Sequence, residues 1–162
     1  MNKPPILYML IGIPGSGKST WINDFVIANG FKPDSYLVLS TDNYIEVAAE
    51  QCSKTYSECF KDYIEKAEHA LQDDLNEAIF SNLDIIWDQT NTTVKSRKKK
   101  LAHPGLARYL KVAIYFDTPY ETCLERIKQR PGKEIPIHIM ESMRNSLAIP
   151  SRDEGFQSII CI

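Results

Sequence analysis

Short apolar runs alternate with longer segments of helical spacing along this chain. The runs have the length of β-strands and show no polar alternation, as is typical of strands buried on both faces. They cover residues 6–11, 36–39, 84–87, 110–116 and 158–162. Helical spacing is found at residues 18–28, 57–82, 95–102, 120–129 and 137–147. This order predicts an α/β fold with a doubly wound, five-stranded parallel sheet and a ligand crevice at the carboxyl ends of its strands.

Length and composition favour one domain over residues 1–162. With 43% hydrophobic and 25% charged residues, the chain can bury one core. The first apolar run is too short to span a bilayer, so we expect no membrane association. The four cysteines are widely scattered and form no C-x-x-C pair, which favours reduced thiols and a cytoplasmic location. The formal net charge of −2 argues against binding a nucleic-acid duplex through many electrostatic contacts to its phosphates. A nucleic-acid substrate would therefore be held locally, and no protein partner is evident.

The first apolar run leads directly into a P-loop motif, which opens a helical segment. Its glycines permit a tight loop whose backbone N–H groups point at phosphate oxygens, assisted by the helix N-terminus. Lys18 is expected to reach the β- and γ-phosphates, Ser19 to bind Mg²⁺ and Thr20 to contact the α-phosphate. The alternative is a simple Gly/Ser turn before a helix. The predicted ATP-binding residues of the motif are Gly12, Ile13, Pro14, Gly15, Ser16, Gly17, Lys18, Ser19 and Thr20.

A polar cluster, Ser40-Thr41-Asp42-Asn43-Tyr44, follows the second apolar run. Asp42 should emerge at the carboxyl edge of the sheet near the P-loop, where a carboxylate can orient an acceptor hydroxyl and take its proton. Ser, Thr, Asp and Asn are also the favoured helix N-caps. Both interpretations remain open, and they are compatible if Thr41 or Asn43 is the cap.

The third apolar run ends in a second polar cluster, Asp88-Gln89-Thr90-Asn91. It is a candidate second wall of the acceptor site, in which Asp88 either holds a magnesium-bound water or fixes the substrate. The alternative is ordinary turn and capping chemistry at a strand end.

Two basic segments come next. The run at residues 95–100 is either a solvated helix face or a guide for a polyanionic acceptor at the mouth of the site. Arg126 and Arg130 lie four residues apart on a helical segment that ends at Pro131-Gly132, so they share one face. This pattern favours a lid whose arginines stabilise the γ-phosphate, over an exposed helix whose arginines pair with neighbouring glutamates.

Several of these segments together resemble the kinase domain of polynucleotide 5′-hydroxyl kinases. They are GIPGSGKSTW, STDNY, DQTN with the downstream Arg97, the R-x-x-x-R segment with IPIHIMESM, and IPSRDEGFQSIICI. The resemblance implies an adenylate-kinase-like P-loop fold with a helical lid, which uses ATP and Mg²⁺ to phosphorylate a nucleic-acid 5′ end. It further implies that Asp42 is the general base and that Arg130 contacts the transferring phosphate. The implied acceptor-binding residues are Asp42, Asp88, Thr90, Asn91 and Arg97.

The chain departs from this family in two places. Phage members carry an arginine three residues after the catalytic aspartate, where it holds the acceptor's 3′-phosphate, and here that residue is Ile45. The bifunctional members add a phosphatase domain with a DxDGT motif, which this sequence lacks. Two other functions therefore stay open: a P-loop kinase of a nucleoside, sugar acid, antibiotic or aminoacyl group, and a non-catalytic ATP-binding switch.

Overall fold

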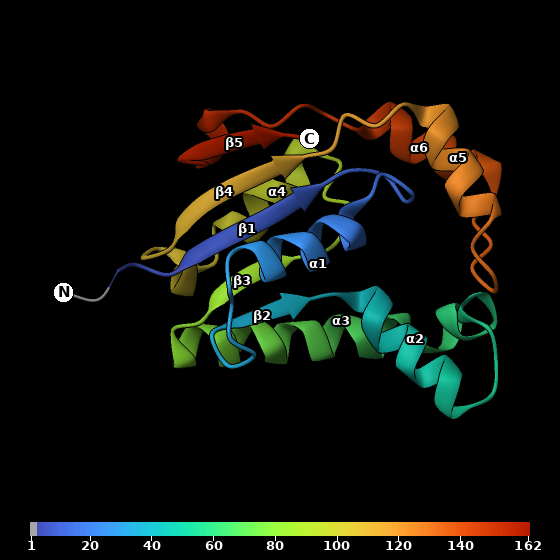
Figure 1. Cartoon of the computed structure of the whole chain (residues 1–162), viewed down its shortest axis with the longest axis horizontal. Helices are drawn as coiled ribbons and strands as arrows, with labels where there is room; N and C mark the ends of the chain where they lie inside the picture. Colours follow the sequence, from blue (N-terminus) through green and yellow to red (C-terminus); the bar gives the residue numbers. More distant parts are fainter. Residues whose placement is uncertain (1–2) are drawn as a thin grey trace.

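A computed structural model describes residues 3–162 and shows a five-stranded, fully parallel sheet (Figure 1). The strands lie in the order β2-β3-β1-β4-β5, which confirms the predicted fold class. Their bounds are β1 (Ile6–Ile11), β2 (Tyr36–Leu39), β3 (Asp84–Trp87), β4 (Leu110–Tyr115) and β5 (Ser158–Cys161).

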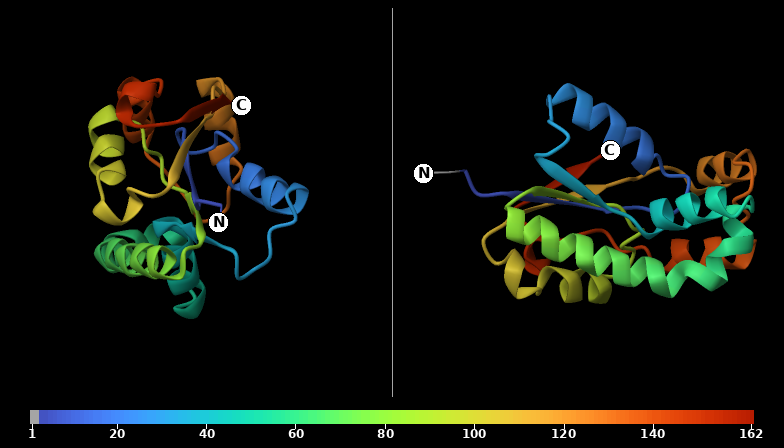
Figure 2. Two further views of the ribbon diagram at one scale, coloured as in Figure 1. Left: turned by 90° about the vertical axis from the view of Figure 1, so that its left-hand side faces the viewer. Right: turned by 90° about the horizontal axis from the view of Figure 1, so that it is seen from below.

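Helices cover both faces of the sheet. Figure 2 shows α1 on one face and α3 and α4 on the other, while α5 and α6 lie beyond the carboxyl ends of the strands. The helices are α1 (Lys18–Ala28), α2 (Thr41–Gln51), α3 (Tyr56–Ser81), α4 (Val94–Leu101), α5 (Tyr120–Lys128) and α6 (Ile137–Ser146). Two short 3₁₀ turns, η1 (Pro104–Leu106) and η2 (Arg152–Glu154), complete the fold.

The sheet is buried between two apolar layers because its central strands carry apolar side chains on both faces. Leu7 and Met9 of β1 pack in a cluster that includes Leu71 and Leu75 of α3. Leu10, on the other face of β1, packs in a second cluster with Ile22 of α1. The two clusters lock the sheet between its helices and bring the loops that follow the strands to one edge. Among residues 3–162, no helix has the length and apolar character needed to cross a membrane.

The sequence pattern did not predict α2. Ser40 caps this helix, since its hydroxyl accepts the N–H of Asn43 at 3.2 Å. Ile45, Ala48 and Ala49 are buried at helical spacing, and Ile45 packs with Cys59 of α3. The helix begins at the polar cluster itself, so Asp42 lies in its first turn and neither Thr41 nor Asn43 is the cap.

Candidate active site

A cavity of about 1230 Å³ opens at the carboxyl edge of the sheet. Its walls come from the P-loop, α2, the start of α3, the loop after β3, and the lid, which we define as α5, α6 and the connecting lid loop at residues 129–136. The lid and the segment formed by α2 and the start of α3 are far apart in the sequence, and both line this cavity. The cavity is large enough to hold a nucleotide and an acceptor side by side.

The P-loop is a close-fitting backbone cradle. Gly15 has φ +81°, and a Cβ there would lie 2.5 Å from the carbonyl oxygen of Cys123 in α5. A Cβ at Gly12 would lie 2.6 Å from the hydroxyl of Ser16. That hydroxyl is buried and has no hydrogen-bond partner within residues 3–162. A phosphate oxygen is the kind of partner that would satisfy it, so the loop fits the phosphates of ATP.

Lys18 supplies the main cation of this cradle. Its ammonium donates to the carbonyls of Gly12 at 2.9 Å and Ile13 at 3.1 Å. Burial lowers the pKa of Lys18, and the nearby carboxylates of Asp88 and Asp42 oppose that shift. Since Lys18 lines the cavity, phosphate oxygens can replace the two carbonyls as its partners.

The remaining P-loop residues divide into two groups. Ser19 and Thr20 are exposed at the cavity wall, where their hydroxyls can meet a metal ion and a phosphate. Ile13 contributes its backbone, because its side chain is 3% exposed and packs against the buried Cys123 and Ile127 of α5. The side chains present therefore fit ATP with Mg²⁺ bound through Ser19.

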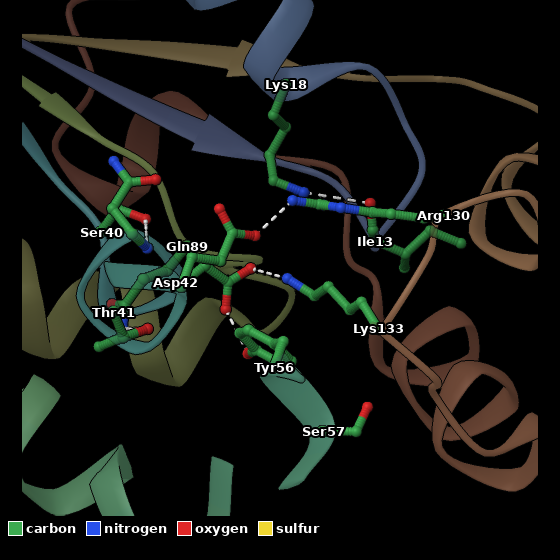
Figure 3. A network of polar contacts seen from close by, with 12 residues as sticks. Ile13, Lys18, Ser40, Thr41, Asp42, Tyr56, Ser57, Gln89, Arg130 and Lys133 are labelled. Carbon is green, nitrogen blue, oxygen red and sulfur yellow. Dashed lines mark hydrogen bonds and ion pairs between the residues drawn. The ribbon is translucent and has the colours of Figure 1, made fainter. Parts of the chain in front are cut away.

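Asp42 lies opposite the P-loop in the same cavity, held by two hydrogen bonds (Figure 3). The Tyr56 hydroxyl donates to one carboxylate oxygen at 2.6 Å, and the Lys133 ammonium donates to the other. Burial alone would raise the pKa of Asp42, but the charge and hydrogen bond of Lys133, with the Tyr56 hydrogen bond and the charge of Lys18, together lower it. Asp42 is therefore ionised and oriented at neutral pH.

Lys133 is the functional candidate that the sequence did not reveal. It comes from the lid loop, is 5% exposed, and lies 4.1 Å from the centre of the Tyr56 ring. The same loop is bound to the start of α3, because the Ser57 N–H donates to the Gly132 carbonyl at 3.2 Å. These contacts hold the lid loop across the cavity. A single lysine in a Pro-Gly-Lys turn carries no pattern that would identify it.

The two lid arginines both line the cavity. Arg126 donates to the carbonyl of Gly15 at 3.1 Å, and Arg130 forms an ion pair with Glu46 of α2. Among the described residues, neither arginine is paired with the neighbouring glutamates of α5 that a simple exposed helix would use. Their positions fit the predicted role of covering the phosphates.

The loop after β3 forms the wall between the P-loop and α2. Asp88 and Thr90 line the cavity. The Gly12 N–H donates to the Thr90 carbonyl at 3.0 Å, which ties the loop to the P-loop. Burial raises the pKa of Asp88, and the charge of Lys18 acts against that shift. Asp88 thus lines the same cavity as Lys18 and Asp42, and the charges of both act on it.

Two residues predicted to bind the acceptor lie outside the cavity. Asn91 is 3% exposed, and its amide donates to the carbonyl of Leu10 at 2.7 Å. Arg97 is fully buried and forms two hydrogen bonds to Glu154, of 2.6 and 2.8 Å. Both side chains are occupied by the protein itself, so they hold the fold around the site and do not meet an acceptor.

Ile45 is also directed away from the cavity, because it is fully buried between α2 and α3. An arginine at this place would have to enter the core, so replacing Ile45 cannot by itself provide a phosphate contact. Glu46, the next residue, lines the cavity. None of the basic run at residues 95–100 lines the cavity. Lys95, Lys98 and Lys99 are exposed, which favours the helix-surface interpretation for these three lysines.

Comparisons with known proteins identify the family and the fold of this chain. A family model described as an AAA domain (AAA_33) matches residues 7–150. A putative kinase from Chloroflexus aurantiacus j-10-fl is similar over 100% of this chain and 86% of its own, with 17% identity and a TM-score of 0.69. A gluconokinase from Sinorhizobium meliloti 1021 is similar over 99% of this chain and 83% of its own, with 16% identity and a TM-score of 0.55.

A chain of the Pnkp1/Rnl/Hen1 RNA repair complex is also similar, with 21% identity and a TM-score of 0.66. The match covers 91% of this chain but 45% of that one, so the present chain spans less than half of its length. At these identities the similarity shows a shared fold and does not identify the acceptor.

Proposed function

Since the chain belongs to the AAA domain family matched over residues 7–150, with the fold of P-loop kinases, we propose that it is an ATP-dependent polynucleotide 5′-hydroxyl kinase. One observation carries the proposal. The carboxylate of Asp42 and the ammonium of Lys18 line the same cavity, one on the acceptor side and one in the phosphate cradle. A nucleotide-binding switch has no use for an oriented carboxylate at that place.

The phosphate side works by positioning and charge. Lys18 and the P-loop N–H groups hold the β- and γ-phosphates, and Arg126 and Arg130 cover them from the lid. Arg130 must exchange Glu46 for a phosphate oxygen to do so. Mg²⁺, when bound through Ser19, supplies further positive charge to the phosphate oxygens.

The acceptor side positions one hydroxyl. The acceptor oxygen forms a bond to the γ-phosphorus while the bond to the β-phosphate oxygen breaks, and ADP leaves. The acceptor's proton passes to Asp42 late in the transfer. The low pKa of Asp42 suits this order, because a weakly basic carboxylate orients the hydroxyl before it removes the proton.

The sequence resemblance supports a nucleic-acid 5′ end as the acceptor, and so does the similar chain in an RNA repair complex. A second candidate, a nucleoside or a sugar acid, carries far less negative charge than a polynucleotide and is favoured by the charges around the acceptor side. The lid cations nearest to it, Arg130 and Lys133, are paired with Glu46 and Asp42. Within the described residues, Lys18 is a further cation whose charge acts on Asp42, but it belongs to the phosphate cradle.

The test is a panel of acceptors with γ-labelled ATP: a 5′-hydroxyl DNA and RNA oligonucleotide, a nucleoside 3′-monophosphate, a plain nucleoside and gluconate. We expect the oligonucleotides to have the highest kcat/KM. Transfer to the nucleoside or to gluconate alone would replace the proposal with the second candidate. ATP binding without transfer to any of these acceptors would favour the non-catalytic ATP-binding switch.

A further inference from the structure

The loop after β3, residues 88–91, is held from behind by a lysine that does not line the cavity. Lys100, in the last turn of α4, donates to the Gln89 side-chain oxygen at 2.6 Å and to the Asn91 side-chain oxygen at 2.5 Å. Its ammonium also lies 5.2 Å from the centre of the Trp87 ring. Lys100 therefore holds the side chains of Gln89 and Asn91 in place on either side of Thr90, and we call these two contacts the Lys100 clamp.

This loop joins three parts of the active site. Thr90 accepts the N–H of Gly12 at 3.0 Å, and Asp88 donates its N–H to the carbonyl of Leu39 at 2.9 Å. The Gln89 amide reaches the hydroxyl of Thr41 in α2 at 3.5 Å. The loop thus connects the P-loop, the end of β2 and the helix that carries Asp42. A change in its position would move the acceptor wall relative to the phosphate cradle.

Lys100 is more buried than its neighbouring lysines in the basic run. Lys98 and Lys99 are exposed, whereas burial lowers the pKa of Lys100 to about 8, with Glu68 acting in the opposite direction. Taking an ammonium out of water is costly unless hydrogen bonds replace its hydration. The Gln89 and Asn91 oxygens provide that replacement. The desolvation cost of burying this ammonium is explained if its two hydrogen bonds hold the 88–91 loop in one conformation.

We propose that Lys100 is a positioning residue for phosphoryl transfer, which acts through Gln89 and Asn91 to fix Asp88 and Thr90 in the acceptor wall. The inference rests on the proposed function, since it assigns Lys100 a part in the same site. Misplacement of reacting groups by about 1 Å can cost about a hundredfold in rate, so a loosened wall is sufficient to slow transfer.

The experiment compares Lys100→Met with Lys99→Met, an exposed neighbour on the same helix, using the shortest acceptor that the wild type phosphorylates. We expect Lys100→Met to lower kcat by about ten- to a hundredfold, with the Kd for ATP unchanged within about twofold. Lys99→Met should leave both unchanged. Equal kcat values for the two variants would overturn the proposal.

Gln89→Met gives a second view of the same contact, and if Lys100→Met folds poorly, Gln89→Met alone should still lower kcat relative to Lys99→Met. If Lys100 acts through Gln89, each single change lowers kcat and the double variant is little worse than either one. Multiplicative losses in the double variant would show that the two residues act independently and would contradict the proposal.

Hydrogen exchange separates this inference from the proposed function. The N–H groups of Gly12 and Asp88 should exchange faster in Lys100→Met than in the wild type or Lys99→Met, whether or not any acceptor is phosphorylated. If the wild type transfers phosphate to nothing in the panel, the proposed function fails while faster exchange still supports the clamp. Unchanged exchange at both groups would overturn the clamp even in an active enzyme.

Discussion

Replacing Glu154 with alanine is expected to destabilise the protein strongly, because it leaves the buried guanidinium of Arg97 without its anion. The side chains of Arg97 and Glu154 are 0% and 1% exposed, and their two hydrogen bonds are 2.6 and 2.8 Å long. The Arg97 guanidinium also donates to the carbonyls of Asn91 and Thr92, each at 3.0 Å. Those carbonyls cannot replace a full negative charge.

Breaking a buried pair by removing one partner costs about 3–5 kcal/mol. For a chain of this size, about 1 kcal/mol corresponds to about 2–4 °C in Tm, so the expected fall is about 6–20 °C. Urea unfolding should give the free-energy difference, and Asp153→Asn, an exposed carboxylate next to Glu154, is the control. The protein that remains folded should keep its affinity for ATP and its KM for the acceptor.

The pH dependence gives the same contact a second test. Burial would raise the pKa of Glu154, but the hydrogen bonds from Arg97 and the Ser151 N–H lower it overall. A carboxylate whose folded pKa is lowered adds stability above its unfolded pKa, and this is lost as the pH falls through the folded value. Glu154→Ala should remove this part of the acid sensitivity. If Glu154→Ala lowers the free energy of unfolding by less than about 1 kcal/mol, the structural role of Arg97 is refuted. A raised acceptor KM with normal stability would also refute it and would support acceptor binding by Arg97.

The other predictions concern the cavity. Lys18→Ala should abolish turnover, measured with γ-labelled ATP, since the γ-phosphate loses its principal cation; turnover near that of the wild type would remove the kinase assignment. Arg130→Ala should lower kcat by about a hundredfold with a smaller change in ATP affinity, and a change confined to KM would mean that Arg130 binds only the ground state. Lys133→Met should move the acid limb of the kcat profile to higher pH, because the cation that lowers the pKa of Asp42 is gone. An unmoved limb would show that Asp42 does not control it.

Most of the fold could be predicted because its strands are buried on both faces. Such strands appear in the sequence as continuous apolar runs, and all five were located to within a residue of their observed ends. The helix α2 was missed because it starts inside the polar cluster at residues 40–44, which also matches turn chemistry. Its buried Ile45, Ala48 and Ala49 carried a weak helical period that was available in the sequence.

The acceptor side was harder to predict, because its side chains are arranged by contacts between distant segments. Arg97 meets Glu154 across 57 residues, and Lys133 meets Asp42 across 91. No local pattern distinguishes a buried arginine from an exposed one, or a lysine that crosses a cavity from one in solvent. Lys100 lies next to exposed lysines in a uniform basic run, and only the fold separates it from them.

Asp42→Asn tests whether Asp42 serves as the base for transfer to a hydroxyl. Ser40, and not Asp42, caps α2, so asparagine leaves the helix cap intact. It removes the negative charge and one of the two oxygens that accept from Tyr56 and Lys133. If Asp42 is the base, ATP affinity should be nearly unchanged, and kcat for the 5′-hydroxyl oligonucleotide should fall by roughly two to four orders of magnitude. Transfer by Asp42→Asn at the rate of the wild type would contradict this role of Asp42.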